Sequence, residues 1–308
     1  MKLLRDILGR TRQSGSEGLR VFNIWLKTYV ESLGHAVAVD GYGNLWVVTD
    51  SVSETLFTCH TDTVHHGVKT LMQGLELKDG ILRLGFPHAG YVLGADDGAG
   101  CWLLLKMIES GVRGTFVFYQ DEEIGGLGSE WSVQNEPERY GKFKRAVAFD
   151  RKGKQDVITH QWGGRCCSQA FAESLCKALD MGHRPDDTGS FTDTANLTEL
   201  VPECTNVSVG YENAHTSAEY LDTVYLNNLL QKLKQVGWEG LPVGRNPEVR
   251  DDPYDYYDWG GGWMSDDDSL NFDELGYILK VGQPYVQELV YGRPEDAARL
   301  LLWCAERL

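Results

Sequence analysis

Short apolar runs that end directly in histidine or acidic residues recur along the first two-thirds of the chain. Runs of this length, rich in β-branched and aromatic residues, are typical of buried strands. The clearest cases are Leu56–Cys59 before His60 and Asp62, Thr115–Tyr119 before Glu122 and Glu123, and Ala146–Phe149 before Asp150. Because ligand sites in α/β sheets form beyond the carboxyl ends of the strands, the pattern predicts a sheet whose polar residues meet at one edge.

The intervening segments have the periodicity of helices, so strands and helices alternate along the chain. This rhythm predicts an α/β fold with a mixed, mostly parallel sheet and helices on both of its faces. We expect helices at 16–34, 99–109, 168–179 and 218–236, and strands at 45–48, 56–59, 115–119, 145–149, 157–160 and 206–210, with a hairpin at 75–84.

Composition limits the classes of partner. The 308 residues contain 29 Lys and Arg against 45 Asp and Glu, a formal net charge of −16, which argues against a nucleic-acid partner. No apolar run reaches the roughly 18 residues of a membrane helix, and the first 20 residues lack the apolar core of a secretory signal. The seven cysteines contain no C-x-x-C pair, so we expect reduced thiols and a cytoplasmic protein.

The chain changes character after about residue 240. We predict a catalytic domain at 1–240, an acidic linker rich in Gly, Tyr and Trp at 241–269, and a small helical C-terminal segment at 270–308. A linker or lid is the expected role of the acidic stretch. Folding of the tail over the site and assembly of several copies into a homo-oligomer are both compatible with the sequence.

Several carboxylates and imidazoles that converge at a sheet edge indicate a metal site, because the carboxylates alone would repel one another. Imidazole and carboxylate ligands without thiolates suit zinc, manganese or cobalt. Two histidines and three carboxylates exceed the ligand set of one open catalytic zinc and suit two ions bridged by one carboxylate. Asp62, two residues beyond His60, is placed to accept the other imidazole N–H.

Glu122 and Glu123 are adjacent and can divide two roles, one as a metal ligand and the other as the base that takes a proton from water. Together these groups can hydrolyse an amide bond. His160 follows another apolar run, where it can contact the substrate or an oxyanion. A peptide or an N-acyl amide is therefore the expected substrate.

The segments that carry these histidines and carboxylates resemble the motifs of the co-catalytic zinc exopeptidases, which include tripeptidase T, bacterial leucyl aminopeptidases and tetrahedral aminopeptidases. The resemblance spans about residues 15–237. The matching segments are His60-Thr-Asp62-Thr, Gly94-Ala-Asp96-Asp97-Gly-Ala-Gly100, Asp121-Glu122-Glu123-Ile-Gly125, Ala148-Phe-Asp150 and His215-Thr-Ser-Ala-Glu219.

The resemblance implies a role for each matched residue. Asp96 would bridge two divalent ions, for which zinc is expected and manganese or cobalt are alternatives. His60 and Asp150 would complete the coordination of one ion, and Glu123 and His215 that of the other. Glu122 would be the general base. Asp62 would orient His60. It also implies a cis peptide bond between Asp96 and Asp97. The stretch Gly189-Ser-Phe-Thr-Asp193-Thr-Ala195 resembles a Thr-Asp-Ala segment of the tetrahedral aminopeptidases, which implies that Asp193 lies near the site as a substrate residue.

An aminopeptidase is the leading interpretation, because only 65 residues separate Asp150 from His215, too few for the inserted lid of some relatives (215 − 150 = 65). A deacylase or carboxypeptidase on the same scaffold is the first alternative, and it requires a cation for the substrate carboxylate, with Arg151 and Arg165 as candidates. The second alternative is an inactive binding or assembly protein that retains the scaffold.

Overall fold

The computed structural model describes residues 1–65, 71–86 and 92–249 of the chain. Most of the predicted linker and the whole predicted C-terminal segment fall within 250–308 and lie outside the described residues. The described part of the predicted linker, up to 249, packs on the domain before it. Gly244 donates its backbone N–H to the carboxylate of Glu203 at 2.6 Å, and Arg245 donates from Nε to the carbonyl of Cys166 at 3.1 Å.

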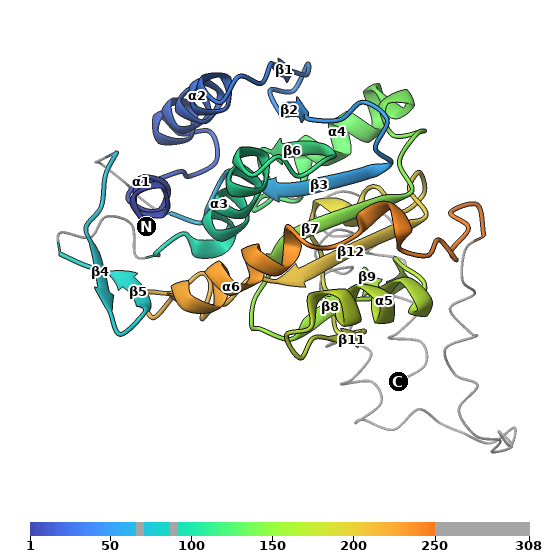
Figure 1. The fold of residues 1–308 in the computed structure, drawn as a ribbon. Helices are drawn as coiled ribbons and strands as arrows, with labels where there is room; N and C mark the ends of the chain where they lie inside the picture. Colours follow the sequence, from blue (N-terminus) through green and yellow to red (C-terminus); the bar gives the residue numbers. More distant parts are fainter. Residues whose placement is uncertain (66–70, 87–91, 250–308) are drawn as a thin grey trace, which may run out of the picture. The chain divides into compact units, whose positions relative to one another are not determined.

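A mixed eight-stranded sheet forms the centre of the described fold (Figure 1). Its order is β1-β2-β6-β3-β7-β12-β8-β11, and the central strands β6, β3, β7 and β12 are mutually parallel. Antiparallel pairs join β1 to β2, β2 to β6, and β12 to β8. The strands are β1 Val37–Val39, β2 Leu45–Val48, β3 Thr55–His60, β6 Thr115–Tyr119, β7 Arg145–Arg151, β8 Asp156–Ile158, β11 Arg184–Asp186 and β12 Glu203–Ser208.

Helices cover both faces of this sheet, as the sequence predicts (Figure 1). Helix α3 packs on β3 and β7, flanked by α1 and α6, while α4 packs on the short helix η2, which contacts the sheet from the other side. The helices are α1 Lys2–Leu8, α2 Glu17–Ser32, α3 Ala95–Glu109, α4 Leu127–Asn135, α5 Gln169–Leu179 and α6 Thr223–Leu233, with 3-10 turns η1 Pro137–Arg139, η2 Asp193–Ala195 and η3 Trp238–Gly240. Each face has its own cluster of buried apolar side chains.

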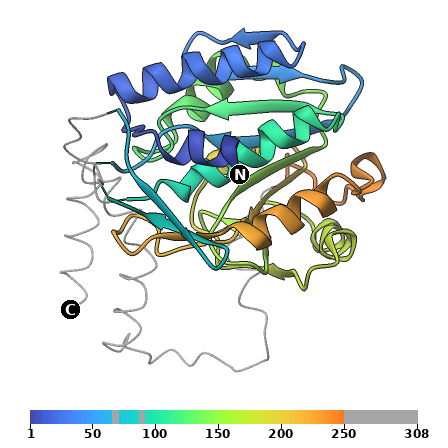
Figure 2. The same ribbon diagram turned by 60° about the vertical axis from the view of Figure 1, so that its left-hand side comes forward.

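Two smaller β elements lie outside the main sheet. The expected hairpin at 75–84 is confirmed, with β4 Leu75–Lys78 and β5 Ile81–Leu84 joined by Asp79 and Gly80, both at positive φ. It continues through β14 Tyr220–Asp222 to β13 Tyr211–Glu212, and in Figure 2 this small sheet lies beside the main one. A second hairpin pairs β9 His160–Gln161 with β10 Gly164–Arg165.

Local chemistry explains why several elements begin where they do. The Ser16 hydroxyl accepts the backbone N–H of Leu19 and caps α2, whose apolar side chains then recur on the buried face. Helix α3 has almost no polar side because it lies between the sheet and the helices α1 and α6. Its start is set by Gly94 at φ 72, a left-handed conformation that glycine adopts without steric strain.

Some predicted boundaries are wrong. The helix expected at 218–236 is shorter, because Tyr220–Asp222 pairs with β5 and the Asp222 carboxylate caps α6 by accepting the N–H groups of Val224 and Tyr225. The strand expected at 206–210 is β12 at Glu203–Ser208, whose first residues pair with β7. The strand expected at 157–160 divides between β8 and β9. Helix α3 is bounded at Ala95, but Asp96 and Asp97 have non-helical backbone angles, so its regular part starts close to the expected Ala99. Helices α1 and α4 were not expected.

The described helices include none that is both long enough and apolar enough to span a lipid bilayer. Six cysteines lie in the described residues, and all six are buried and free of disulfide bonds. The seventh, Cys304, lies outside the described residues.

Candidate metal centre and catalytic cavity

The sequence-predicted residues meet at the carboxyl ends of the parallel strands. His60 is the last residue of β3, Asp150 lies near the end of β7, and Glu122 and Glu123 follow β6. Since β6, β3 and β7 are adjacent and parallel, these ends share one edge of the sheet.

Asp96 lies between the two histidines and presents one carboxylate oxygen to each. His60 Nε2 lies 3.2 Å from Asp96 Oδ1, whereas His215 Nε2 lies 3.1 Å from Asp96 Oδ2. His60 Nε2 is also 3.4 Å from Asp150 Oδ1, and His215 Nε2 is 3.1 Å from Glu123 Oε2. The described structure therefore brings together all five predicted ligands, in two groups that share Asp96.

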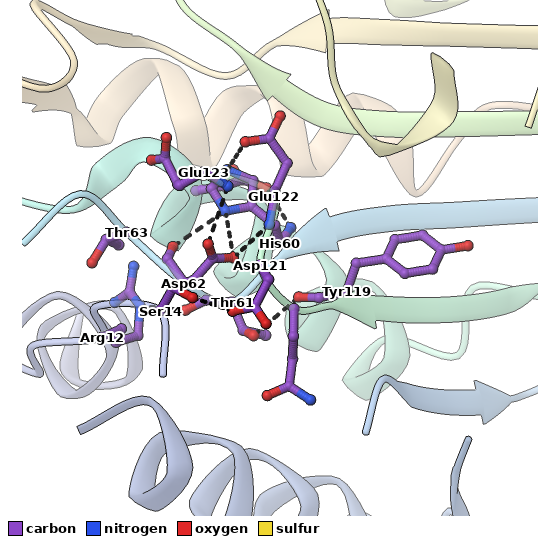
Figure 3. Close-up of polar contacts among 12 residues, drawn as sticks. Arg12, Ser14, His60, Thr61, Asp62, Thr63, Tyr119, Asp121, Glu122 and Glu123 are labelled. Atoms are coloured by element: carbon purple, nitrogen blue, oxygen red, sulfur yellow. Dashed lines mark hydrogen bonds and ion pairs between the residues drawn. The ribbon is translucent and has the colours of Figure 1, made fainter. Parts of the chain in front are cut away.

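Asp62, in the loop that follows β3, joins His60 to the loop that carries the glutamates (Figure 3). Its Oδ1 accepts the backbone N–H of Glu122 and its Oδ2 that of Glu123, each at 3.1 Å. Its Oδ1 also lies 3.5 Å from His60 Nδ1, while its backbone carbonyl lies 3.2 Å from the same nitrogen. Asp62 is fully buried, so these contacts fix the orientation of His60 and the position of Glu122.

Residues that sequence reasoning missed hold Asp150, among them Tyr211, whose hydroxyl donates to the Asp150 backbone carbonyl at 2.8 Å. Thr192 donates its hydroxyl to Asp150 Oδ2 at 2.7 Å, and the side-chain carbonyl of Asn206 accepts the backbone N–H of Asp150 at 2.9 Å. Thr192 lies within the stretch 189–195 that resembles a Thr-Asp-Ala segment, and Asn206 lies in a predicted strand. Neither position carries a sequence signal for this role, because both contacts depend on the pairing of distant segments.

A buried cation, Arg12, joins α1 to both loops of the site. Its guanidinium donates to the carbonyls of Ile7, Thr61 and Gly94 at 2.8–2.9 Å, and it also stacks over the ring of Phe22. The chain around Arg12 thus fixes the loop after His60 and the turn before Asp96. An isolated arginine in a segment without a motif gave no reason to expect this contact.

The turn that carries Asp96 is closely packed. The Asp96–Asp97 peptide bond is cis, as the family resemblance implies. A Cβ atom at Gly100 would lie 2.4 Å from both the Asp97 carboxylate and the carbonyl of Phe149, so glycine lets α3 approach β7. Asp97 itself accepts the backbone N–H groups of His60 at 3.2 Å and of Gly100 at 2.9 Å.

The electrostatics of the cluster favour positive charge between the carboxylates. Burial alone would lower the pKa of His60, but Asp150, Asp62 and Asp96 together raise it well above its usual value. Hydrogen bonds to Asp96 and Glu123 raise the pKa of His215 to about 11. Burial, reinforced by neighbouring carboxylates, raises the pKa of Glu122 well above that of a free glutamate and the pKa of Asp150 to about 6.

The donor set fits divalent cations. His60, Asp96 and Glu123 form one group whose ligand atoms all lie within 4.8 Å of one another, and His60, Asp97 and Asp150 form another. Because Asp97 already accepts two backbone N–H groups, we regard it as a support for the loop. Glu123 Oε1 is buried and has no hydrogen-bond partner within the described chain, which leaves it available to an ion.

A cavity of about 490 Å³ opens beside these residues. Asp96, Glu122, Glu123, Asp150 and His215 line it, together with Phe191 and Ile158. The two residues predicted to contact substrate do not line it. His160 lies in β9, where its Nδ1 is 2.9 Å from the Thr159 hydroxyl, and Asp193 is buried behind the site, where burial raises its pKa to about 8.

Comparisons with known proteins agree with the fold described above. No protein-family model matches the sequence, and no curated protein matches it. Aminopeptidase PepT from Bacillus cereus superposes with a TM-score of 0.57 at 16% identity, over 76% of this chain and 95% of that one. An aminopeptidase from the archaeon Desulfurococcus kamchatkensis gives a TM-score of 0.57 at 15% identity, over 80% and 95%.

The TET1 peptidase of Pyrococcus horikoshii, which can assemble into a tetrahedron or a large octahedral shell, gives a TM-score of 0.56 at 15% identity, over 76% of this chain and 98% of that one. At identities this low, the superpositions establish the fold alone. The chain therefore has the zinc exopeptidase-like fold that its sequence motifs predict and that these aminopeptidases share.

Proposed function

We propose that the chain is a two-metal peptidase that hydrolyses an amide bond, with an aminopeptidase as the leading form. The observation that supports it most strongly is the position of Asp96, whose two oxygens face two different histidines at 3.2 and 3.1 Å. Two divalent cations, most simply zinc, would supply the positive charge that polarises the substrate carbonyl and favours ionisation of water near neutral pH. His60 and Asp150 would hold one cation, and Glu123 and His215 the other.

Glu122 is the candidate general base. Its Oε2 lies 3.9 Å from His60 Nε2, and its side chain lines the cavity. It therefore lies close to the candidate metal ligands but belongs to neither of the two ligand sets. Its raised pKa suits a group that accepts a proton from the attacking water and then donates it to the leaving amine. The products are a carboxylate and an amine, so the single water supplies all the atoms that are added.

Topology supports an aminopeptidase. The segment between Asp150 and His215 forms β8 to β13 together with α5 and η2, which belong to the same domain and leave no chain for a separate lid. The first alternative needs a cation for the substrate carboxylate. Arg151 is an unsuitable candidate, because it is paired with Asp156 at 3.1 Å and with Thr188 at 2.9 Å. Arg165 does not line the cavity.

Lys152 favours the deacylase or carboxypeptidase as a second candidate. It lines the cavity two residues beyond Asp150, it is exposed, and the described structure assigns it no ion pair. A carboxypeptidase would lose most of its kcat/KM on Lys152→Met, because the substrate carboxylate loses its cation. An aminopeptidase acting on peptide amides, which have no terminal carboxylate, would not.

The deciding experiment gives zinc-loaded protein three substrates that share one sequence: a free peptide, its N-acetylated form and its C-terminal amide. Mass spectrometry identifies the products. An aminopeptidase releases the first residue from the free peptide and from the amide, and leaves the acetylated peptide intact. Release of acetate or of the last residue would replace this proposal with the alternative.

Lack of turnover on a broad peptide panel, with metal bound, would instead favour the silent binding protein. Assembly remains a separate prediction. Light scattering of the full chain measures its mass in solution. A mass that is a whole multiple of the 34.5 kDa chain mass, twice or more, would show the expected homo-oligomer.

A further inference from the structure

The hairpin of β9 and β10 carries a tryptophan where such hairpins favour small polar residues. Its two-residue turn is Trp162-Gly163, with φ of 50° and 73°. Turns with two positive φ values favour Asn, Asp and Gly, and a bulky side chain in this conformation is unfavourable. Trp162 is nevertheless 54% exposed, so burial in the core does not explain its presence.

Trp162 fixes the loop that follows β11. Its indole stacks on the ring of Phe191 with centroids 4.8 Å apart and an interplanar angle of 26°. Its backbone N–H donates to the carbonyl of Ser190 at 2.8 Å. A locally unfavourable residue is thus held in place by contacts to one neighbouring loop, which is the pattern expected of a functional position.

Phe191 connects this stack to the catalytic cavity. It lines the same cavity as Glu122 and Asp150. It also occupies the space above Gly126, where a Cβ atom would lie 2.3 Å from Phe191 Cζ, so the loop after the catalytic glutamates is shaped to accept the ring. Ile158, Gln161, Gly189, Ser190 and Phe191 contribute uncharged groups to the lining, and Arg151 and Lys152 contribute two cations to the same cavity.

We propose that Phe191, held in place by Trp162, and Ile158 form a specificity subsite for a large apolar side chain, best an aromatic one, on the substrate residue that precedes the scissile bond. This inference rests on the proposed peptidase function. An aromatic substrate side chain would pack against the Phe191 ring, whose orientation Trp162 fixes from behind. A charged side chain packed against the Phe191 ring and Ile158 would lose hydration that these apolar groups do not replace.

The test compares dipeptides that differ only in the first residue, Phe-Ala against Gly-Ala, with the zinc-loaded full chain. We expect kcat/KM to favour Phe-Ala by at least about tenfold. Trp162→Asn suits the turn better than the wild type, so it should fold with equal or higher thermal stability, and we expect it to reduce this preference about threefold to tenfold. Phe191→Ala removes the wall itself and should reduce it further.

Val52→Asn is the matched control, because it also removes an exposed apolar side chain, but from the β2–β3 turn at the other edge of the sheet. It should leave the preference unchanged. A wild-type preference below about twofold, or an unchanged preference in both aromatic variants, would overturn the subsite. A change of oligomeric mass in Trp162→Asn without a change of preference would also overturn it and assign the stack to a subunit contact.

Calorimetry with the hydroxamates of phenylalanine and glycine separates this inference from the proposed function. Tighter binding of the phenylalanine compound, weakened in both aromatic variants, would support the subsite even if no peptide were hydrolysed. Hydrolysis of both dipeptides at equal rates, with equal hydroxamate affinities, would leave the peptidase intact and refute the subsite.

Discussion

The carboxylate of Glu219 accepts the backbone N–H of Asp96 at 3.1 Å, across 123 residues of sequence. The same carboxylate accepts the N–H groups of Gly94 and Ala95 at 2.9 and 2.8 Å. Three consecutive donors at the start of α3 therefore converge on one side chain that is 1% exposed. Glu219 thus positions the residue on which the two histidines meet.

We expect Glu219→Gln to destabilise the protein by about 1–3 kcal/mol, because the amide has one acceptor oxygen and leaves at least one buried N–H unpaired. The same change should weaken zinc affinity, since the turn carrying Asp96 loosens. Urea denaturation and competition with a zinc chelator measure the two effects. Glu173→Gln, on the exposed side of α5, is the control. Wild-type stability in Glu219→Gln would contradict this account.

Glu122→Gln should keep its metal and lose turnover by a factor of about 10² to 10⁴, because the amide retains the shape of the side chain but accepts no proton. Metal analysis and kcat are measured on the same sample. Glu130→Gln, an exposed change on α4, should match the wild type in both. Near wild-type kcat in Glu122→Gln would assign the base to another residue.

His183 gives the fold a pH dependence outside the catalytic cluster. Its Nε2 lies 2.9 Å from the Tyr225 hydroxyl, its Nδ1 is buried without a hydrogen-bond partner in the described part of the chain, and burial lowers its pKa to about 4. A lowered histidine pKa means that the unfolded chain binds the proton more readily. The stabilising contribution of the neutral ring is therefore complete above pH 6.5 and is lost as the pH falls towards 4.

Between pH 7.5 and pH 5 the free energy of unfolding should fall by about 2 kcal/mol from this residue alone. His183→Gln should show a correspondingly smaller fall over the same range. Denaturant titrations at the two pH values measure the difference, and His35→Gln, a change just after α2, serves as the control. Equal pH dependence in the wild type and in His183→Gln would refute the assignment.

The residues that bind or react were predictable because each follows a strand whose sequence signal is strong. His60, Glu122, Glu123 and Asp150 come directly after or within apolar runs, and parallel pairing of β6, β3 and β7 then brings them together. The small hairpin at 75–84 was predictable for a similar reason, since Asp79-Gly80 defines its turn.

The residues that hold the ligands were not predictable. Arg12, Thr192 and Asn206 act through contacts with segments far away in the sequence, and no local pattern marks them. Boundaries failed where a tertiary contact competes with local preference, as at Tyr220–Asp222, which joins a sheet edge where helical periodicity was expected. At Trp162 the local sequence would not predict the turn, because a turn with two positive φ values disfavours tryptophan.

The central claim is that Asp96 bridges two cations. Crystals of zinc-loaded protein, measured above and below the zinc absorption edge, test it directly. The account predicts two anomalous peaks per chain, about 3.5–4 Å apart on either side of the Asp96 carboxylate, and the loss of both in Asp96→Ala. No peak at this carboxylate in the wild type, or two peaks retained in Asp96→Ala, would contradict it.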